Sequence, residues 1–116
     1  MEALKNFITL SQKIEIYVPS TINVNTEIDN SEYVKKTAIL LANCFGGASS
    51  ELLLGYWMSD KCGLVTEKTT KVYANCNSED LEKHIEEIVQ WCYTMKTELS
   101  QESIAITVNN VMHFIY

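Results

Sequence analysis

The chain begins with an ambiguous polar lead and then shows a clear alternation of apolar and polar side chains. Residues 14–18 alternate with period two until Pro19 interrupts the pattern, which predicts a half-buried strand. Residues 52–58 and 64–74 are two further runs with strand character, and they flank turn-forming residues at 59–63. We therefore expect these two runs to form a hairpin with a loop longer than two residues.

The last part of the chain predicts a second, tighter hairpin. Residues 104–108 and 111–115 are both rich in β-branched and aromatic side chains, and only Asn109 and Asn110 separate them. Asparagine tolerates the positive φ angles of a type I′ turn. We therefore expect a two-residue hairpin in which Ile106 faces His113.

A helical repeat of apolar residues marks two segments between the predicted strands. The second segment is the clearer, with apolar side chains spaced by three and four residues at Leu81, Ile85, Ile88, Cys92, Met95 and Leu99. Asn77 or Ser78 can cap it, and Glu79 and Asp80 suit its positive first turn. The sequence thus predicts a long amphipathic helix with one apolar stripe.

The first helical segment follows a polar stretch, residues 20–30, that reads as a loop. Asn30 or Ser31 can cap this helix, and Gly46-Gly47 can end it in left-handed geometry. Its inward positions are expected at Val34, Thr37, Ala38, Leu41 and Phe45.

The predicted order of elements is β-α-β-β-α-β with one extra terminal strand. Two helices in this order most naturally cover one face of an antiparallel sheet. We therefore expect a ferredoxin-like α+β fold in a single domain spanning residues 1–116, with residues 1–11 as a loosely attached lead.

The terminal hairpin is apolar on both faces. One face carries Ile104, Ile106, Val108, Val111, His113 and Ile115, and the other carries Ala105, Thr107, Met112, Phe114 and Tyr116. A sheet covered by helices on one side should show only one apolar face. We therefore expect the second set to form the interface of a homodimer or of a higher oligomer built from one.

Charge and composition narrow the classes of partner. The net charge is −6, and all nine basic residues are lysines. Arginine is the usual residue for clamping phosphates and reading base edges, so we do not expect direct nucleic-acid binding. Membrane-spanning runs and a signal-peptide core are both missing from the sequence, so a cytoplasmic location is expected.

Cysteine and histidine spacing predicts no metal site. Cys44, Cys62, Cys76 and Cys92 contain no C-x-x-C pair, and we expect them to act as buried free thiols. His84 is expected on the solvated side of its helix, and His113 is expected to be a core or interface histidine. We also expect no bound cofactor.

The glycines direct attention to one strand pair. Gly46-Gly47 end a helix at its negative pole, where a phosphate would not bind. Gly55 lies beside Tyr56 and Trp57, and we expect it to face Glu67 across the hairpin. A carboxylate beside aromatic rings could act as an acid or base or accept ligand hydrogen bonds. A plain solvent-facing strand residue is the alternative interpretation.

With these motifs placed, the chain resembles a set of small uncharacterised bacterial and phage proteins. The matching segments are YVPST (17–21), FGGA (45–48), GYW (55–57), GLVTE (63–67) and QESIA (101–105). The resemblance implies a ferredoxin-like fold and no agreed activity. Its motifs lie on strand ends and turns, which is compatible with a ligand pocket lined by Tyr17, Thr21, Gly55, Tyr56, Trp57, Glu67 and Gln101. A signature of the fold alone is the alternative interpretation.

The leading functional hypothesis is a non-enzymatic, homo-oligomeric binding module. Because relatives occur in phages, it could be a counter-defence protein that sequesters a nucleotide-like signalling molecule or blocks a host protein. One alternative is an enzyme in which Glu67 serves as general acid or base across a dimer. Another is an interaction protein whose acidic surface occupies a basic groove of a partner.

Overall fold

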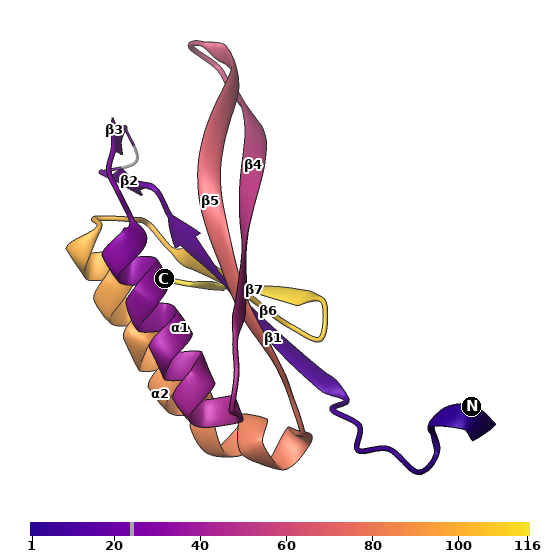
Figure 1. Ribbon diagram of the computed structural model, residues 1–116. Coiled ribbons are helices and arrows are strands. Elements are labelled where there is room, and N and C mark those ends of the chain that lie inside the picture. The colour runs from indigo at the N-terminus through magenta and orange to yellow at the C-terminus, as the bar shows by residue number, and fades with distance from the viewer. Residues whose placement is uncertain (24) are drawn as a thin grey trace.

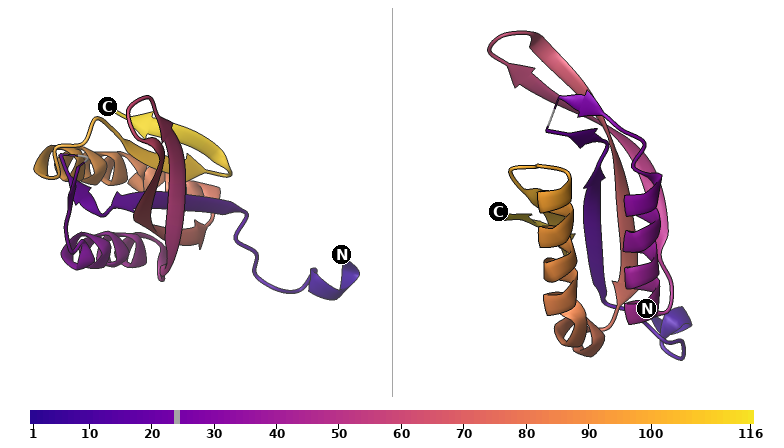
Figure 2. Two further views of the ribbon diagram at one scale, coloured as in Figure 1. Left: turned by 90° about the horizontal axis from the view of Figure 1, so that it is seen from above. Right: turned by 90° about the vertical axis from the view of Figure 1, so that its left-hand side faces the viewer.

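A five-stranded antiparallel sheet with two helices on one face forms the body of the protein in a computed structural model, which describes residues 1–23 and 25–116 (Figures 1 and 2). The strands run in the order β4-β5-β1-β6-β7. Their bounds are β1 Gln12–Pro19, β4 Ser49–Ser59, β5 Gly63–Cys76, β6 Ile104–Val108 and β7 Val111–Ile115. The helices are α1 Ser31–Phe45 and α2 Ser78–Glu98. This order confirms the predicted ferredoxin-like arrangement, with β7 as the extra edge strand.

The hydrophobic core lies between the helices and one face of the sheet. The central strands β1, β5 and β6 supply Ile14, Ile16, Val18, Val72, Ala74, Cys76, Ile104 and Ile106, and the helices supply Leu41, Leu81, Ile88, Cys92 and Met95. The side chains of Ile14, Ile16 and Val18 share the core face of β1 because strand side chains alternate between faces, and the buried positions of α2 follow its period of 3.6 residues. Within residues 1–23 and 25–116, no helix lies on the opposite face of the sheet (Figure 2), and we call it the open face.

The helix ends depend on local side-chain chemistry. Asn77 caps α2, and its side chain accepts a hydrogen bond from the Asp80 amide at 2.7 Å, as predicted. Gly46 ends α1 with φ of 88°, a left-handed geometry that favours glycine. Asn30 precedes α1, but its side chain donates to the Pro19 carbonyl at 3.0 Å instead of capping the helix.

The hairpin β6–β7 has the predicted register, with Ile106 opposite His113 and Val108 opposite Val111. The helices cover only part of its inward face. Ile104 and Ile115 are buried, whereas Val111 is 59% exposed and His113 is also exposed. His113 is therefore not a core residue within one chain, because the helix layer ends before it reaches the turn of this hairpin, and its place in an interface stays a prediction.

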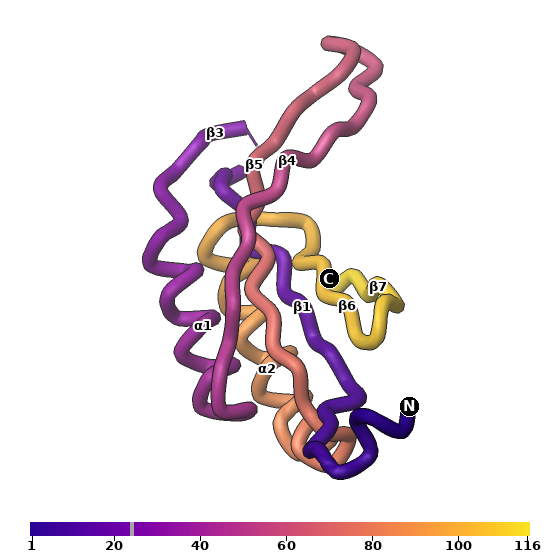
Figure 3. Tube along the Cα trace, turned by 45° about the vertical axis from the view of Figure 1, so that its right-hand side comes forward, coloured from indigo at the N-terminus to yellow at the C-terminus, as the bar shows by residue number. Residues whose placement is uncertain are grey.

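The hairpin β4–β5 extends well beyond the helix layer (Figures 1 and 3). We call its outer part, residues 52–66, the arm. Register places alternate side chains of the arm on the face that continues the core side of the sheet. Five of them are large, apolar and exposed, and we call this set the arm stripe: Leu52, Leu54, Tyr56, Met58 and Leu64.

Two peripheral segments complete the chain. The expected loop 20–30 contains a small hairpin of β2 Thr21–Ile22 and β3 Thr26–Glu27, although residue 24 within it lies outside the described residues. Residues 1–11 include a single 3₁₀ turn, Glu2–Leu4, and extend away from the sheet as exposed chain (Figure 1). In the described part of the chain, no helix is both long and apolar enough to cross a membrane.

Candidate functional site

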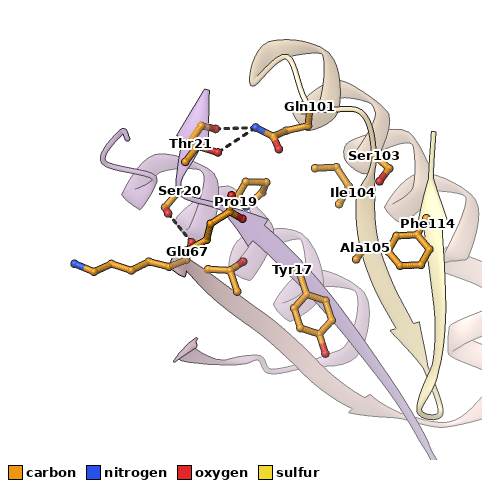
Figure 4. Close-up of a pocket in the computed structure, with 12 residues that line it drawn as sticks. Tyr17, Pro19, Ser20, Thr21, Glu67, Gln101, Ser103, Ile104, Ala105 and Phe114 are labelled. Atoms are coloured by element: carbon orange, nitrogen blue, oxygen red, sulfur yellow. Dashed lines mark hydrogen bonds between the residues drawn. The ribbon is translucent and has the colours of Figure 1, made fainter. Parts of the chain in front are cut away.

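A cavity of about 250 Å³ opens beside the end of β1 on the open face of the sheet (Figure 4). Four of the residues expected at a ligand site line it, and they come from four different parts of the chain: Tyr17 on β1, Thr21 on β2, Glu67 on β5 and Gln101 after α2. Residues 80 positions apart in sequence are thus brought to one place. Figure 4 shows Tyr17, Glu67 and Gln101 arranged around the opening.

Hydrogen bonds to backbone carbonyls hold the cavity walls together. The side-chain amide nitrogen of Gln101 donates to the Thr21 carbonyl at 2.9 Å, and the backbone amide of Asn23 donates to the Leu99 carbonyl at 3.0 Å. These two bonds attach β2 to the segment that leads from α2 into β6. Ser20 donates from its hydroxyl to the Lys68 carbonyl, which fixes the same segment to β5. The walls are therefore positioned before any ligand arrives.

Glu67 supplies a carboxylate that has no side-chain partner among the described residues. It is half-buried. Side chains alternate along β5, so Glu67 and Thr69 point to the open face, whereas Lys68 points to the face that continues the core side. Lys68 also lines the cavity but points toward the opposite face of β5. The acidic group is therefore the charged group best placed to meet a ligand inside the cavity.

Trp57 and Gly55 lie next to this cavity, on the side of the arm that continues the open face of the sheet. Trp57 lines a neighbouring hollow of about 500 Å³ that shares Thr21 and Glu67 with the first cavity. Gly55 is paired directly with Glu67, and a Cβ atom there would lie 3.8 Å from the Glu67 carbonyl oxygen. That is an ordinary contact, so the space does not require a glycine.

Tyr56 is not brought into the site. Neighbouring strand residues point to opposite faces, so Tyr56 joins the arm stripe at 61% exposure while Trp57 stays on the cavity side.

Phe114 and Ala105 line the cavity although the sequence indicated them only as interface residues. Tyr17, Ala105 and Phe114 all lie on the open face. The register of the β6–β7 hairpin pairs Ala105 with Phe114, so it could have predicted that both residues lie on the same face as Tyr17. Of the other expected interface residues, Met112 and Tyr116 are 47% and 75% exposed. Thr107 is instead buried within the chain, where its hydroxyl donates to the Glu15 carboxylate.

The cysteines are free thiols with different surroundings. Cys76 and Cys92 are buried as expected, and burial raises the pKa of Cys92 to about 12. Cys62 contradicts the expectation, because it is exposed in the turn of the arm. His84 does as well: only 22% of its side chain is exposed, and its ring packs edge-on against Phe45 with centroids 5.9 Å apart.

No protein-family model matches the sequence, and no curated protein matches it either. Similarity appears among solved structures. A phage SAM lyase in complex with S-methyl-5'-thioadenosine matches with a TM-score of 0.66 and 15% identity, over 97% of this chain and 94% of that chain. A phage SAM lyase in the apo state matches with a TM-score of 0.60 and 16% identity, over 95% and 92%.

A further match is CutA from Synechococcus elongatus, with a TM-score of 0.48 and 8% identity over 94% of this chain and 85% of that one. At these identities the two phage structures establish the α+β fold, with its two helices and five-stranded antiparallel sheet. The expected resemblance to phage proteins is thus confirmed in part, at the level of the fold.

Proposed function

We propose that this chain is a homo-oligomeric module that binds a small sulfur-containing nucleoside, of the class of S-methyl-5'-thioadenosine (MTA) and S-adenosylmethionine (SAM), in the cavity between Tyr17, Glu67 and Gln101. The cavity itself is the observation that carries this proposal. The structural similarity to a phage SAM lyase in complex with MTA supports the choice of ligand class.

The groups in the cavity suit a nucleoside better than a nucleotide. Tyr17 and Phe114 offer aromatic rings on which a base can stack, and Thr21 and Gln101 offer hydroxyl and amide groups for the sugar or the base edge. A phosphate would need arginines or a cluster of lysines, and the chain has no arginine. The Glu67 carboxylate instead favours a cationic centre such as a sulfonium.

The homo-oligomeric part of the proposal rests on surfaces that one chain leaves uncovered. At about 250 Å³ the cavity is smaller than the roughly 300–1,000 Å³ of sites that enclose a ligand. Phe114 lines the cavity and is also part of the exposed apolar patch with Met112 and Tyr116. A second copy covering this patch would therefore complete the cavity wall as well as the hydrophobic surface.

Ligand binding can be tested by isothermal titration calorimetry with MTA, SAM, adenosine and ADP. MTA or SAM should bind, and ADP should bind at least tenfold more weakly, because no arginine is available for its phosphates. Thermal unfolding provides a second readout, since a ligand at 100 times its Kd stabilises by about 2.7 kcal/mol. If neither MTA nor SAM binds at millimolar concentration, the proposal is wrong.

Glu67→Gln tests the cavity assignment, with Glu82→Gln on the exposed side of α2 as the matched control. The Glu67 variant should weaken SAM binding more than MTA binding, because only SAM carries the sulfonium charge. The Glu82 variant should bind both as the wild type does. Equal losses in the two variants would contradict a specific role for Glu67.

A second candidate function, a lyase that acts on SAM, is favoured by the position of Glu67 in the cavity and by the name of the similar phage protein. Breaking the bond between the sulfonium sulfur and the amino-acid side chain leaves the electron pair on sulfur and gives neutral MTA. As this bond breaks, Glu67 is placed to accept a proton from the neighbouring carbon of the amino-acid side chain, the C–H electron pair forms a carbon–carbon double bond in the product, and Glu67 then passes the proton to solvent.

This reaction can be separated from simple binding by incubating SAM with the protein and measuring MTA by chromatography. A lyase would produce MTA catalytically, and Glu67→Gln would abolish turnover. If SAM stays intact while calorimetry shows binding, the protein is a binding module and not a lyase. Either result would fit a counter-defence role, in which expression of the chain in a host cell lowers the free SAM concentration.

A further inference from the structure

Three side chains with metal-ligand chemistry converge where the end of α1 meets the first half of α2. Cys44 lies in the last turn of α1, and His84 and Glu87 lie one turn apart on α2. The Cys44 sulfur is 3.3 Å from the Glu87 Oε1 atom, and His84 Nδ1 is 2.6 Å from the same oxygen. One ligand atom from each residue lies within 4.8 Å of the others.

The surroundings of these three residues favour a cation. The carbonyl end of α1 carries the negative pole of the helix dipole, and Cys44 lies in that last turn. In the part of the chain that the structure describes, no lysine forms an ion pair with Glu87. The Cys44 thiol donates a hydrogen bond to the Glu87 carboxylate, which shows that the two ligand groups already face each other across the helix pair.

Two independent contacts position the cluster without metal. The Phe45 ring packs at 88° to the His84 ring and limits its rotation. The helices are anchored at their other end as well, where the Tyr33 hydroxyl on α1 donates to the Glu98 carboxylate on α2 at 2.9 Å. Cys44, at 40 positions from His84 in sequence, is therefore held against α2 by packing along the whole helix pair.

We propose that Cys44, His84 and Glu87 form a zinc site that joins the two helices. Zn²⁺ accepts this mixture of sulfur, nitrogen and oxygen ligands, and three protein ligands leave a fourth position for water. With bonds of about 2.0–2.3 Å to a central ion, the His84–Glu87 contact must open from its 2.6 Å hydrogen-bond distance. The thiol proton passes to solvent as the zinc–sulfur bond forms.

The site is separate from the nucleoside cavity. The cavity lies on the open face, near the start of α1 and the end of α2, whereas the zinc site lies in the helix layer at the opposite ends of both helices (Figure 1). The proposed function and the zinc site can therefore succeed or fail independently.

Cobalt substitution tests the site directly on the full chain after treatment with a chelator. Adding Co²⁺ should produce a near-ultraviolet thiolate-to-cobalt charge-transfer absorption that saturates at one equivalent per chain, and Zn²⁺ should displace it. Cys44→Ser should abolish the band. Cys62→Ser is the matched control, because Cys62 is an exposed thiol on the arm, and this variant should keep the band unchanged.

A second variant keeps the test valid if Cys44→Ser fails to fold. Glu87 is exposed on the helix surface, so Glu87→Gln should fold normally by circular dichroism. It should weaken Zn²⁺ binding by about tenfold or more, an effect of the size that even supporting groups at metal sites show. The zinc site is refuted if the wild type binds no Co²⁺ stoichiometrically, or if Cys62→Ser loses the band instead of Cys44→Ser.

Discussion

Thr37 is a fully buried hydroxyl at the contact between the two helices. Its Oγ1 atom donates to the Tyr33 carbonyl at 2.7 Å and accepts a hydrogen bond from the Trp91 indole at 2.8 Å. The Tyr33 and Trp91 rings stack next to this bond, with centroids 6.3 Å apart. A residue that takes an apolar place in the helical pattern thus satisfies the polar atom of a large aromatic side chain.

Thr37→Val should lower the free energy of unfolding by about 1–3 kcal/mol, because valine keeps the shape but leaves the Trp91 nitrogen without an acceptor. Urea denaturation measures this loss. Thr94→Val is the matched control, since Thr94 is exposed and its hydroxyl bonds only to its own helix, and its effect should stay within about 0.5 kcal/mol. If Thr37→Val is as stable as the wild type, Trp91 does not depend on this bond.

Glu15 is a buried carboxylate on the open face, at 6% exposure. Burial raises its pKa, but the Thr107 hydroxyl and the Lys71 ammonium at 3.0 Å donate hydrogen bonds to it, and nearby Lys13 adds its charge. The net result is a pKa below the usual 4.5. The ionised form is therefore the one that stabilises the folded chain.

Glu15→Gln should lower the stability at pH 7 by about 1.5–3 kcal/mol, the range for hydrogen bonds to a charged group. The loss should not exceed this range, because Lys71 keeps its second partner Glu51 at 3.0 Å. The contribution of Glu15 is present above its unfolded pKa and is lost as the pH falls through its lower folded pKa. The difference between wild type and variant should thus be constant near neutral pH and shrink below about pH 4.5. A difference that grows on acidification would contradict this assignment.

The β6–β7 hairpin is set by two asparagines in left-handed geometry, with φ of 51° at Asn109 and 69° at Asn110. The Asn109 side chain also accepts a hydrogen bond from the Lys13 amide at 2.8 Å, which ties the turn to β1. Because this hairpin brings Phe114 to the cavity, its turn geometry also determines the shape of the site.

Asn110→Val should destabilise the fold by about 1–2 kcal/mol, the cost of left-handed geometry for a residue that resists it. Asn110→Gly should leave the stability unchanged or raise it. The same exchange at Asn75, an exposed residue within β5, is the control, and Asn75→Val should be tolerated because extended backbone suits valine. Equal urea midpoints for Asn110→Val and Asn75→Val would show that the turn is not strained.

At the level of elements, most of the fold could be predicted from the sequence, because side-chain periodicity and helix caps are local signals. The β6–β7 register, the capping of α2 by Asn77 and the end of α1 at Gly46 all follow from a few neighbouring residues. The small hairpin β2–β3 was missed, since two-residue strands show no periodicity.

Less of the candidate site could be predicted from the sequence, because the site depends on how the helices and strands pack against one another. Strand alternation alone could have shown that Tyr56 and Trp57 cannot both face Glu67. The contact of Cys44 with Glu87, in contrast, depends on the rotation of each helix about its axis. The apolar stripe of a single helix does not encode where its polar edge meets the other helix, so the polar side of α2 looked purely solvated at His84.

At the level of the whole molecule, the chain has an elongated shape of 55 × 28 × 22 Å, and the arm projects from its body (Figure 1). It carries the arm stripe on one side and Trp57 on the other, and the body carries a second apolar patch at Met112, Phe114 and Tyr116. Large exposed apolar patches on a small chain mark association surfaces. Two unlike patches on one chain can meet head to tail between copies, and such contacts close into rings when the rotation allows.

Light scattering coupled to size-exclusion chromatography should therefore give, for the wild type, the mass of two or more chains of 13.2 kDa each. Leu54→Glu on the arm and Phe114→Glu on the open face should each shift the mass toward the single chain, because both place a charge in a desolvated contact. Ile39→Glu is the matched control, since Ile39 is 51% exposed on α1 and away from both patches. A wild-type mass of one chain would refute self-association, whereas loss of the oligomer in Phe114→Glu alone would assign the contact to the open face.

Because Phe114 also lines the cavity, any variant that separates the copies should weaken MTA binding in parallel with the loss of the oligomer. Unchanged MTA affinity in a dissociated Leu54→Glu chain would show that one copy holds the complete site.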